Sequence, residues 1–429
     1  MKTPCIIIPG FGQSKAELFD ENGSSVRQVW PLKTDAKEMA KRILAPYLKT
    51  VLARRDRGFT DRVNELFSEV LEPLSTDENG EMRHPMRAVA YSDSLKDSPE
   101  KVRNYIYKLV PVASLAKEIG EENIFFFAYN AFEDPFLTAQ RLDGFISDVK
   151  KETGSAKVDL LTFSMGGMIS TAYLDRYGSK GEVGKVFYLA AAMRGSLLQA
   201  DIFERHFDKK QGYSLLEFFA SKKAGDTFRK VLAFVPWEVR YGVLYRSFDA
   251  IIETGMLNSP GMWALMPVER YRELSEKFIS DERHTLLKEK TDRFFAAQTR
   301  LPETLEALQK QGMRFYAACG CGLRMIELSA SDEVNSDTIL AVGSPSLGAV
   351  AAKRGETLDE HGRDAAFLSP DRTIDASACM LRDTTWFFEG VSHRALSRSA
   401  KVGELIRRAF TDEGFTDVQS DKDFPRFME

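Results

Sequence analysis

The stretch that decides the fold of this chain is Val158-Asp159-Leu160-Leu161-Thr162-Phe163-Ser164-Met165-Gly166-Gly167. Its apolar first half is typical of a buried strand, and the apolar spacing after Gly167 predicts a helix. A serine between a strand and a helix, next to small residues, is typical of a nucleophile elbow. Such a turn lifts the hydroxyl above the sheet and places it at a helix N-terminus, where developing negative charge is stabilised. We therefore predict that Ser164 is a catalytic nucleophile.

One position of this stretch departs from the usual elbow motif. That motif is G-x-S-x-G, and Thr162 stands where the motif has its first glycine. Gly166 keeps the second glycine, at the point where the helix packs against the strand. An ordinary glycine-rich turn between a strand and a helix is therefore the alternative interpretation.

Short apolar runs alternate with helical patterns along the rest of the chain. The strands that these runs predict are 5–8, 124–128, 158–162, 186–190, 315–318 and 385–388. Two helices are predicted by apolar residues that share one face, namely Leu142, Phe145, Ile146 and Val149 in the first and Val402, Leu405, Ile406 and Phe410 in the second. Gly154 is predicted to end the first of these helices. This alternation predicts an α/β fold with a mostly parallel sheet.

Composition and charge exclude several classes of protein. The chain has 429 residues, with 59 basic and 63 acidic side chains and a formal net charge of −4, a balance unlike that of a dedicated nucleic-acid binder. Four cysteines cannot form a disulfide scaffold, and we interpret Cys319 and Cys321 as buried strand residues rather than metal ligands. No run approaches the ~18 apolar residues of a membrane span, and the N-terminus lacks a signal-peptide pattern. We therefore expect a cytoplasmic protein with no metal at these cysteines and no nucleic-acid partner.

Two regions interrupt the alternation of strands and helices, and no linker flanks either of them. Residues of about 20–111 are charged and helix-like, and residues of about 195–311 carry helical patterns rich in Phe, Leu, Met and Trp. We predict that residues 1–194 form the first part of an α/β core, with 20–111 as a helical insertion. Residues 195–311 are predicted to form a helical cap, and 312–429 the second part of the core. Within that second part, residues of about 323–369 are predicted to form loops, because they are richer in Gly and Ser.

A second chemical signal lies at the N-terminus, where the apolar run Ile6-Ile7-Ile8 breaks into Pro9-Gly10-Phe11-Gly12. In α/β-hydrolases the loop after an early strand donates one backbone N–H to the oxyanion hole, and the residue after the nucleophile donates the other. Phe11 and Met165 are therefore the predicted donors. The alternative is a nucleotide-binding loop, but the third glycine of G-x-G-x-x-G is missing, because position 15 is lysine.

The remaining parts of a catalytic triad are predicted near the C-terminus. Asp371 lies in a polar turn, and His393 follows the predicted strand 385–388. Ser164, Asp371 and His393 stand in the chain order Ser–Asp–His of an α/β-hydrolase. In that arrangement the serine attacks, the histidine acts as general base and the aspartate orients the histidine. Asp375 competes with Asp371 for the acid role.

These segments resemble the lecithin:cholesterol acyltransferase-like lipase family within the α/β-hydrolases. The segments that carry the resemblance are Ile8-Pro9-Gly10-Phe11-Gly12, Phe127-Ala128-Tyr129-Asn130, Ser164-Met165-Gly166-Gly167, Pro370-Asp371-Arg372-Thr373-Ile374 and Ser392-His393-Arg394-Ala395-Leu396. Weaker matches are Gly195-Ser196 and Trp263-Ala264-Leu265-Met266-Pro267. The resemblance places Asp371 at the family's acid position, and it implies an acyl-ester substrate, a covalent acyl-serine and no metal or organic cofactor.

The expected function is that of a serine esterase or lipase whose cap covers an apolar acyl pocket. The cap stretches 215–219 and 231–235 are apolar enough to line that pocket, or else they form the core of the cap itself. We expect medium or long acyl esters to be preferred over acetate, and the cap to allow transient contact with a membrane surface. The alternatives are an acyltransferase with the same triad, and a catalytically inactive scaffold that binds a partner or a lipid.

Overall fold

A central parallel sheet organises the chain in the computed structural model, which describes residues 2–31, 36–91, 93–206, 226, 229–326, 329, 331 and 333–428. Its seven strands lie in the order β12-β11-β8-β7-β6-β1-β5. They are β1 (Cys5–Ile8), β5 (Ile124–Phe126), β6 (Val158–Phe163), β7 (Val183–Leu189), β8 (Arg314–Cys321), β11 (Thr385–Glu389) and β12 (Phe427–Met428). The six predicted strands are all confirmed. β12 is too short for its hydrophobic pattern to be recognised.

The two faces of the sheet carry two separate hydrophobic cores. Alternate residues of a strand point to opposite faces, so Ile6 and Ile8 lie in one core while Cys5 and Ile7 lie in the other. The first core is covered by α5 (Pro135–Thr153), α6 (Gly166–Tyr177), α13 (Thr285–Thr299) and α14 (Leu301–Lys310). The second is covered by α3 (Glu100–Leu109), α4 (Ala113–Ile119) and α16 (Ala400–Thr411). A parallel sheet with helices on both faces is the predicted α/β-hydrolase fold.

Both helices predicted from a single apolar face are confirmed. Leu142, Ile146 and Val149 are buried in α5, which ends at Gly154 with a positive φ of 68°. The apolar residues of α16 are likewise buried against the sheet. A left-handed C-terminal residue is favourable only where no Cβ is present, which explains the glycine at position 154.

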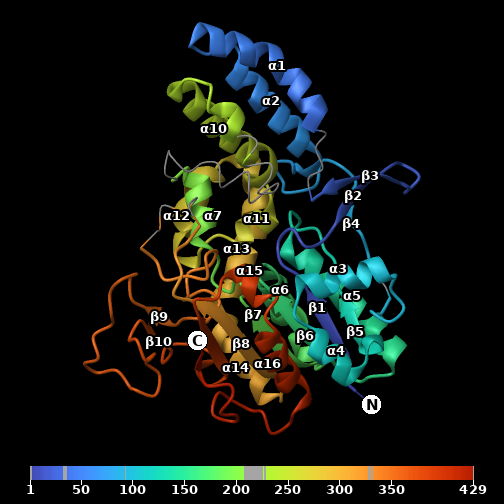
Figure 1. The fold of residues 1–429 in the computed structure, drawn as a ribbon. Coiled ribbons are helices and arrows are strands. Elements are labelled where there is room, and N and C mark those ends of the chain that lie inside the picture. Colours follow the sequence, from blue (N-terminus) through green and yellow to red (C-terminus); the bar gives the residue numbers. More distant parts are fainter. Residues whose placement is uncertain are drawn as a thin grey trace.

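The insertion of about 20–111 contains strands as well as the predicted helices. β2 (Ala16–Phe19), β3 (Ser25–Trp30) and β4 (Met86–Ala88) form a small antiparallel sheet in the order β3-β2-β4. Between its strands lie α1 (Ala36–Ala53), α2 (Phe59–Leu71) and the short η1 (Glu72–Leu74). Figure 1 shows α1 and α2 at the end of the molecule farthest from the central sheet. The first three residues of β3 are all exposed and only its last two are buried, so the strand lacks the alternation that a sequence pattern reveals.

Residues 195–311 are mostly helical where the structure describes them. The helices are α7 (Leu197–Glu204), α10 (Trp237–Ala250), η4 (Ile251–Met256), α11 (Pro260–Ala264), α12 (Val268–Phe278), η5 (Glu282–His284), α13 and α14. The apolar stretch 215–219 lies outside the described residues. The stretch 231–235 packs with residues of α1, α2 and α10, so it belongs to a helical core of its own. The division of the chain at 194/195 and 311/312 stays a prediction.

The segment between β8 and β11 consists mainly of turns, as predicted. Its regular pieces are β9 (Val350–Ala351) and β10 (Ile374–Asp375), which pair with each other, and η6 (Arg382–Thr384). The remaining short elements are η2 (Glu121–Asn123), η3 (Gly178–Lys180) and α15 (His393–Leu396). Within the part of the chain that the structure describes, no helix is long and apolar enough to span a membrane.

A buried carboxyl group makes the stability of this fold depend on pH. Asp159 on β6 accepts a hydrogen bond from the backbone N–H of Lys185 at 2.8 Å. Burial raises the pKa of Asp159 to about 7, although Lys185 lowers it and Glu413 raises it further. The folded pKa lies above the ordinary value of about 3.9, so the folded state binds the proton more tightly than the unfolded state does. The resulting stabilisation is complete below about pH 4 and is lost as the pH rises to about 7.

Asp159→Asn is expected to remove this dependence, because the amide oxygen can still accept from Lys185 and carries no charge. Between pH 5 and pH 8 the unfolding free energy of the wild type should fall by roughly 2–3 kcal/mol relative to the variant. Urea denaturation at the two pH values measures both free energies. Two proteins whose stabilities change in parallel would contradict the assignment.

Candidate active site

Ser164 stands in the strained turn that the elbow motif requires. It follows β6 directly and has a φ of 54°, a left-handed conformation that is costly for a residue with a side chain. A Cβ at Gly166 would lie 2.3 Å from the carbonyl oxygen of Ile8, so the close packing of α6 on β1 needs a glycine there. Thr162 lies within β6, where its hydroxyl donates to the carbonyl oxygen of Phe187 at 3.4 Å. The strand therefore accommodates a side chain at the motif's first position.

His393 lies against Ser164, as predicted. Its Nε2 is 2.9 Å from the Oγ of Ser164, and the two residues come from the ends of different strands, β11 and β6. The imidazole side chain is 10% exposed and packs against the ring of Phe163, with a centroid distance of 5.1 Å. A histidine that is nearly buried beside a serine hydroxyl has the geometry of a general base and its nucleophile.

The acid beside His393 is Asp337, which the sequence analysis did not single out. Its Oδ2 lies 2.6 Å from Nδ1 of His393, and its carbonyl oxygen accepts the backbone N–H of His393, also at 2.6 Å. Its other carboxylate oxygen accepts the backbone N–H groups of Ile339 and Leu340, at 3.0 and 2.8 Å. The side chain is 0% exposed. Both carboxylate oxygens therefore have hydrogen-bond partners, and the carboxylate is held in one orientation.

The prediction that Asp371 contacts the histidine is wrong in this structure. The carboxylate of Asp371 accepts from the Ser369 hydroxyl at 2.6 Å and from the Thr373 hydroxyl at 2.8 Å, within its own turn. Asp375, the competing residue, is buried on β10 and forms an ion pair with Arg363. Both aspartates stabilise local structure in the long segment after β8, and an earlier turn of the same segment supplies the carboxylate at His393.

Gly320 on β8 allows the acid and the histidine loop to approach the same strand. A Cβ at this position would lie 2.1 Å from the carbonyl oxygen of Val391 and 3.0 Å from the Cβ of Asp337. β8 and β11 are neighbours, with Gly320 opposite Phe388. The acid and the base therefore leave the carboxyl ends of adjacent parallel strands, and the missing side chain makes room for both.

Phe11 and Met165, the predicted oxyanion donors, both line the cavity beside Ser164. The cavity has a volume of about 60 Å³. Its remaining lining is mostly apolar and consists of Ala192, Ser196, Leu198, Gln199, Ile202, Met256, Met262, Leu265, Ile339 and Leu340. The structure thus brings together Ser164, His393, Phe11 and Met165, and it replaces Asp371 with Asp337.

Two of the weaker family segments also lie at this cavity. Ser196 lines it and donates its hydroxyl to the carbonyl oxygen of Ile339 at 3.0 Å, next to the loop of Asp337. Leu265, from the segment that begins with the buried Trp263, lines it as well. Tyr129 lies behind the N-terminal loop, where its hydroxyl donates to the carbonyl oxygen of Pro9 at 2.8 Å. These residues shape the cavity and its supporting loops.

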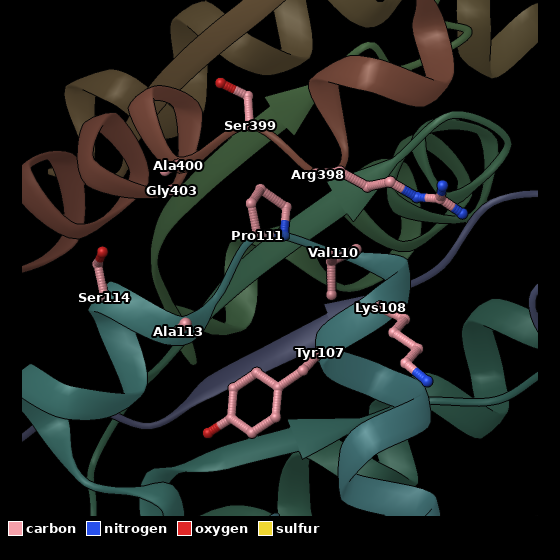
Figure 2. A pocket seen from close by; sticks show the side chains of 10 residues that line it. All are labelled: Tyr107, Lys108, Val110, Pro111, Ala113, Ser114, Arg398, Ser399, Ala400 and Gly403. Carbon is pink, nitrogen blue, oxygen red and sulfur yellow. The ribbon is translucent and has the colours of Figure 1, made fainter.

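A larger hollow lies elsewhere, between α3, α4 and α16 (Figure 2). Its volume is about 500 Å³, and Lys108, Pro111, Ser114, Arg398 and Ser399 are among its lining residues. Lys108 and Arg398 are exposed, and in Figure 2 their charged ends do not converge on one point. Ser164 and His393 are not part of this lining, so the hollow is separate from the candidate active site.

Cys319 and Cys321 are buried residues of β8, as predicted. Burial raises the pKa of both thiols, and the Cys321 thiol donates to the carboxylate of Glu389 at 3.2 Å. Among the described residues, no group of three or more His, Cys, Asp or Glu side chains is arranged to hold a metal ion.

Comparison with protein families finds no matching family model, and comparison with curated proteins finds no matching sequence. Among solved structures, the chain is similar to the Tle4–Tli4 complex, with 12% identity over 95% of this chain and 98% of that chain and a TM-score of 0.39. It is also similar to phospholipase PlaB from Legionella pneumophila, with 13% identity over 77% of this chain and 59% of that chain and a TM-score of 0.36. For Bacillus licheniformis lipase BlEst2 the identity is 9%, over 69% of this chain and 84% of that chain, with a TM-score of 0.30.

These TM-scores are too low for the similar structures to indicate a function. The function of this chain is therefore inferred from the geometry of its own site. The resemblance to the lecithin:cholesterol acyltransferase-like family stays a prediction.

Proposed function

We propose that the protein is a serine hydrolase that cleaves carboxylic esters of apolar acyl groups through an acyl-serine intermediate. The observation that carries this proposal is the continuous contact from Ser164 Oγ through His393 to the buried carboxylate of Asp337, with distances of 2.9 and 2.6 Å. A serine, a histidine and a carboxylate in this order are sufficient for nucleophilic catalysis, whichever loop supplies the acid.

The proton moves along this contact in the proposed reaction. Nδ1–H of His393 donates to Asp337, which leaves Nε2 free to accept the hydroxyl proton of Ser164 as its oxygen attacks the ester carbonyl carbon. The imidazolium then gives this proton to the leaving alkoxide, and the acyl group stays on the serine. Water, deprotonated by the same nitrogen, releases the acid and restores the hydroxyl. Asp337 stabilises the imidazolium in both steps.

The backbone N–H groups of Phe11 and Met165 are the proposed donors to the oxyanion. Both residues line the cavity at Ser164, and Met165 precedes the first residue of α6, so its N–H lies at the positive end of that helix. A Cβ at Gly10 would lie 2.8 Å from the Cβ of Ser164, which shows how closely the N-terminal loop passes the nucleophile. This close passage supports the assignment of Phe11.

The apolar lining of the cavity favours an aliphatic acyl group. Leu198, Ile202, Met256 and Leu265 contribute side chains to this lining. A volume of about 60 Å³ holds a few carbon atoms, so a longer chain requires the helices that carry these residues to move apart. The substrate class that fits is an ester of a hydrophobic acid, such as a lipid.

A panel of p-nitrophenyl esters from acetyl to dodecanoyl tests this substrate class. Each additional buried methylene contributes about 0.8 kcal/mol, so kcat/KM should rise by about 15-fold from acetyl to butyryl, and octanoyl esters should stay above acetyl. A reaction without protein measures the uncatalysed hydrolysis, and Ser164→Ala measures the rate that does not depend on the nucleophile. A kcat/KM that is highest for the acetyl ester would contradict an apolar acyl substrate.

A further inference from the structure

α1 exposes a stripe of leucines to solvent. Leu44, Leu48 and Leu52 recur at every fourth position and are 53%, 48% and 84% exposed. Residues four apart lie on one face of a helix, so the three side chains form a continuous apolar row. The adjoining face of α1, about 100° round the helix, is buried, because Ile43, Tyr47 and Val51 pack into the core that α1 shares with α2 and α10.

Two exposed aromatic residues lie in the segment that packs beside α1. Phe234 and Trp237 are 73% and 49% exposed. The hydroxyl of Tyr47 on α1 donates to the carbonyl oxygen of Val231 at 3.1 Å, which fixes this segment next to the helix. Nine large hydrophobic residues are exposed in the described chain. Five of them therefore belong to α1 and to the segment that packs beside it.

α1 and the turn that follows it carry a local excess of positive charge. Between Glu38 and Arg57 the sequence has six basic and two acidic residues, a net charge of +4. Since the whole chain carries −4, the other residues together carry −8. Lys41 and Lys49 are exposed on α1 itself, and three arginines follow at its carboxyl end, namely Arg54, Arg55 and Arg57.

We propose that the exposed face of α1, with Phe234 and Trp237, docks on an anionic phospholipid surface. An amphipathic helix with leucines on one face and lysine or arginine beside them inserts its apolar side chains at the level of the headgroups. Tryptophan favours the same depth, and each basic side chain near the surface gains from the negative potential. A second copy of this face is a poorer partner, since it would bring two +4 segments together.

A continuous helical segment, α10 followed by η4, connects this surface with the active-site cavity. α10 begins at Trp237, and η4 continues it to Met256, whose side chain lines the cavity beside Ser164. The role of the docking surface in bringing the enzyme to lipid rests on the proposed function, whereas the binding itself does not. The two can therefore be tested separately.

Co-sedimentation with vesicles tests the binding on a Ser164→Ala background, so that hydrolysis cannot alter the lipid. We expect the full chain to bind phosphatidylcholine vesicles that contain phosphatidylglycerol more tightly than vesicles of phosphatidylcholine alone. The triple variant Leu44→Gln, Leu48→Gln, Leu52→Gln should bind at least about 100-fold more weakly. Arg54→Gln with Arg55→Gln should weaken binding by roughly 25-fold on the anionic vesicles alone. Leu286→Gln, which changes an exposed leucine of α13, is the matched control and should bind like the unchanged chain.

The same substitutions with Ser164 intact should leave the hydrolysis of a soluble butyryl ester unchanged, which shows that the fold is preserved. Equal vesicle binding by the chain with and without the leucine stripe would overturn the proposal, as would failure of the unchanged chain to bind anionic vesicles. A change from dimer to monomer in the triple variant, with vesicle binding unaltered, would show instead that a second copy covers this face. If the unchanged chain binds the vesicles but does not hydrolyse the ester, only the proposed function is contradicted.

Discussion

Ser164→Ala is expected to lower kcat for ester hydrolysis by about 10⁶-fold, because no other hydroxyl among the described residues bonds to His393 Nε2. The oxyanion donors and the cavity stay in place, so a residual rate of about 10³–10⁴ over the uncatalysed reaction should remain. The measurement is kcat on a chromogenic butyryl ester, with urea denaturation to confirm that the fold is intact.

Ser170→Ala is the matched control for this substitution. Ser170 lies on the same helix, α6, and its hydroxyl donates to the carbonyl oxygen of Gly167 at 2.8 Å, away from the histidine. Its loss should change kcat by less than about tenfold. Near-normal activity in Ser164→Ala, beside a large loss in Ser170→Ala, would show that the nucleophile is not Ser164.

Asp337→Asn is expected to lower kcat by about 10⁴-fold. The N–H groups of Ile339 and Leu340 both point at one oxygen of residue 337, so the amide must keep its oxygen on that side. Its NH₂ group then faces Nδ1 of His393 and makes that nitrogen an acceptor. The proton of the neutral ring moves to Nε2, which can no longer take the proton of Ser164.

Asp371→Asn is the matched control for the acid. Its contacts are confined to Ser369 and Thr373 in an outer turn, so the substitution should change kcat by less than about tenfold. Both variants are measured on the same ester with circular dichroism as the folding check. A collapse of activity in Asp371→Asn beside near-normal activity in Asp337→Asn would restore the assignment that the sequence pattern favours.

The central sheet could be predicted because its strands are buried on both faces. A run such as Cys5-Ile6-Ile7-Ile8 has no polar residue to face solvent, and this absence is readable without any knowledge of the partner strands. The turn at Ser164 was equally readable, since the apolar strand, the serine, the two glycines and the helical pattern follow one another directly in the sequence. These features are determined by short-range geometry.

The acid could not be predicted, because its position depends on how a long loop segment folds. Asp337, Asp371 and Asp375 all lie between β8 and β11, so each satisfies the order Ser–Asp–His. Which of them reaches His393 is decided by contacts distant in sequence, above all the absence of a side chain at Gly320. Asp337 is the first described aspartate after β8, but the order Ser–Asp–His does not exclude the later two.

The exposed face of α1 was also outside the reach of the sequence pattern. Ile43, Tyr47 and Val51 directly precede Leu44, Leu48 and Leu52 in the sequence, so two apolar rows lie side by side on the helix. Only the packing of α2 and of the segment before α10 determines which of the two rows is buried. An amphipathic pattern identifies a helix more readily than it identifies the face that remains in water.

Covalent labelling with a fluorophosphonate, followed by mapping of the modified residue, tests the central claim most directly. The reagent reacts with a serine only where a base removes its proton and an oxyanion hole stabilises the adduct. We predict one adduct per chain, on Ser164 within the tryptic peptide that runs from Val158 to Arg176, and loss of labelling in Ser164→Ala and in His393→Ala. An adduct on another residue, or no adduct on the folded chain, would contradict the assignment of Ser164, His393 and Asp337 as a catalytic triad.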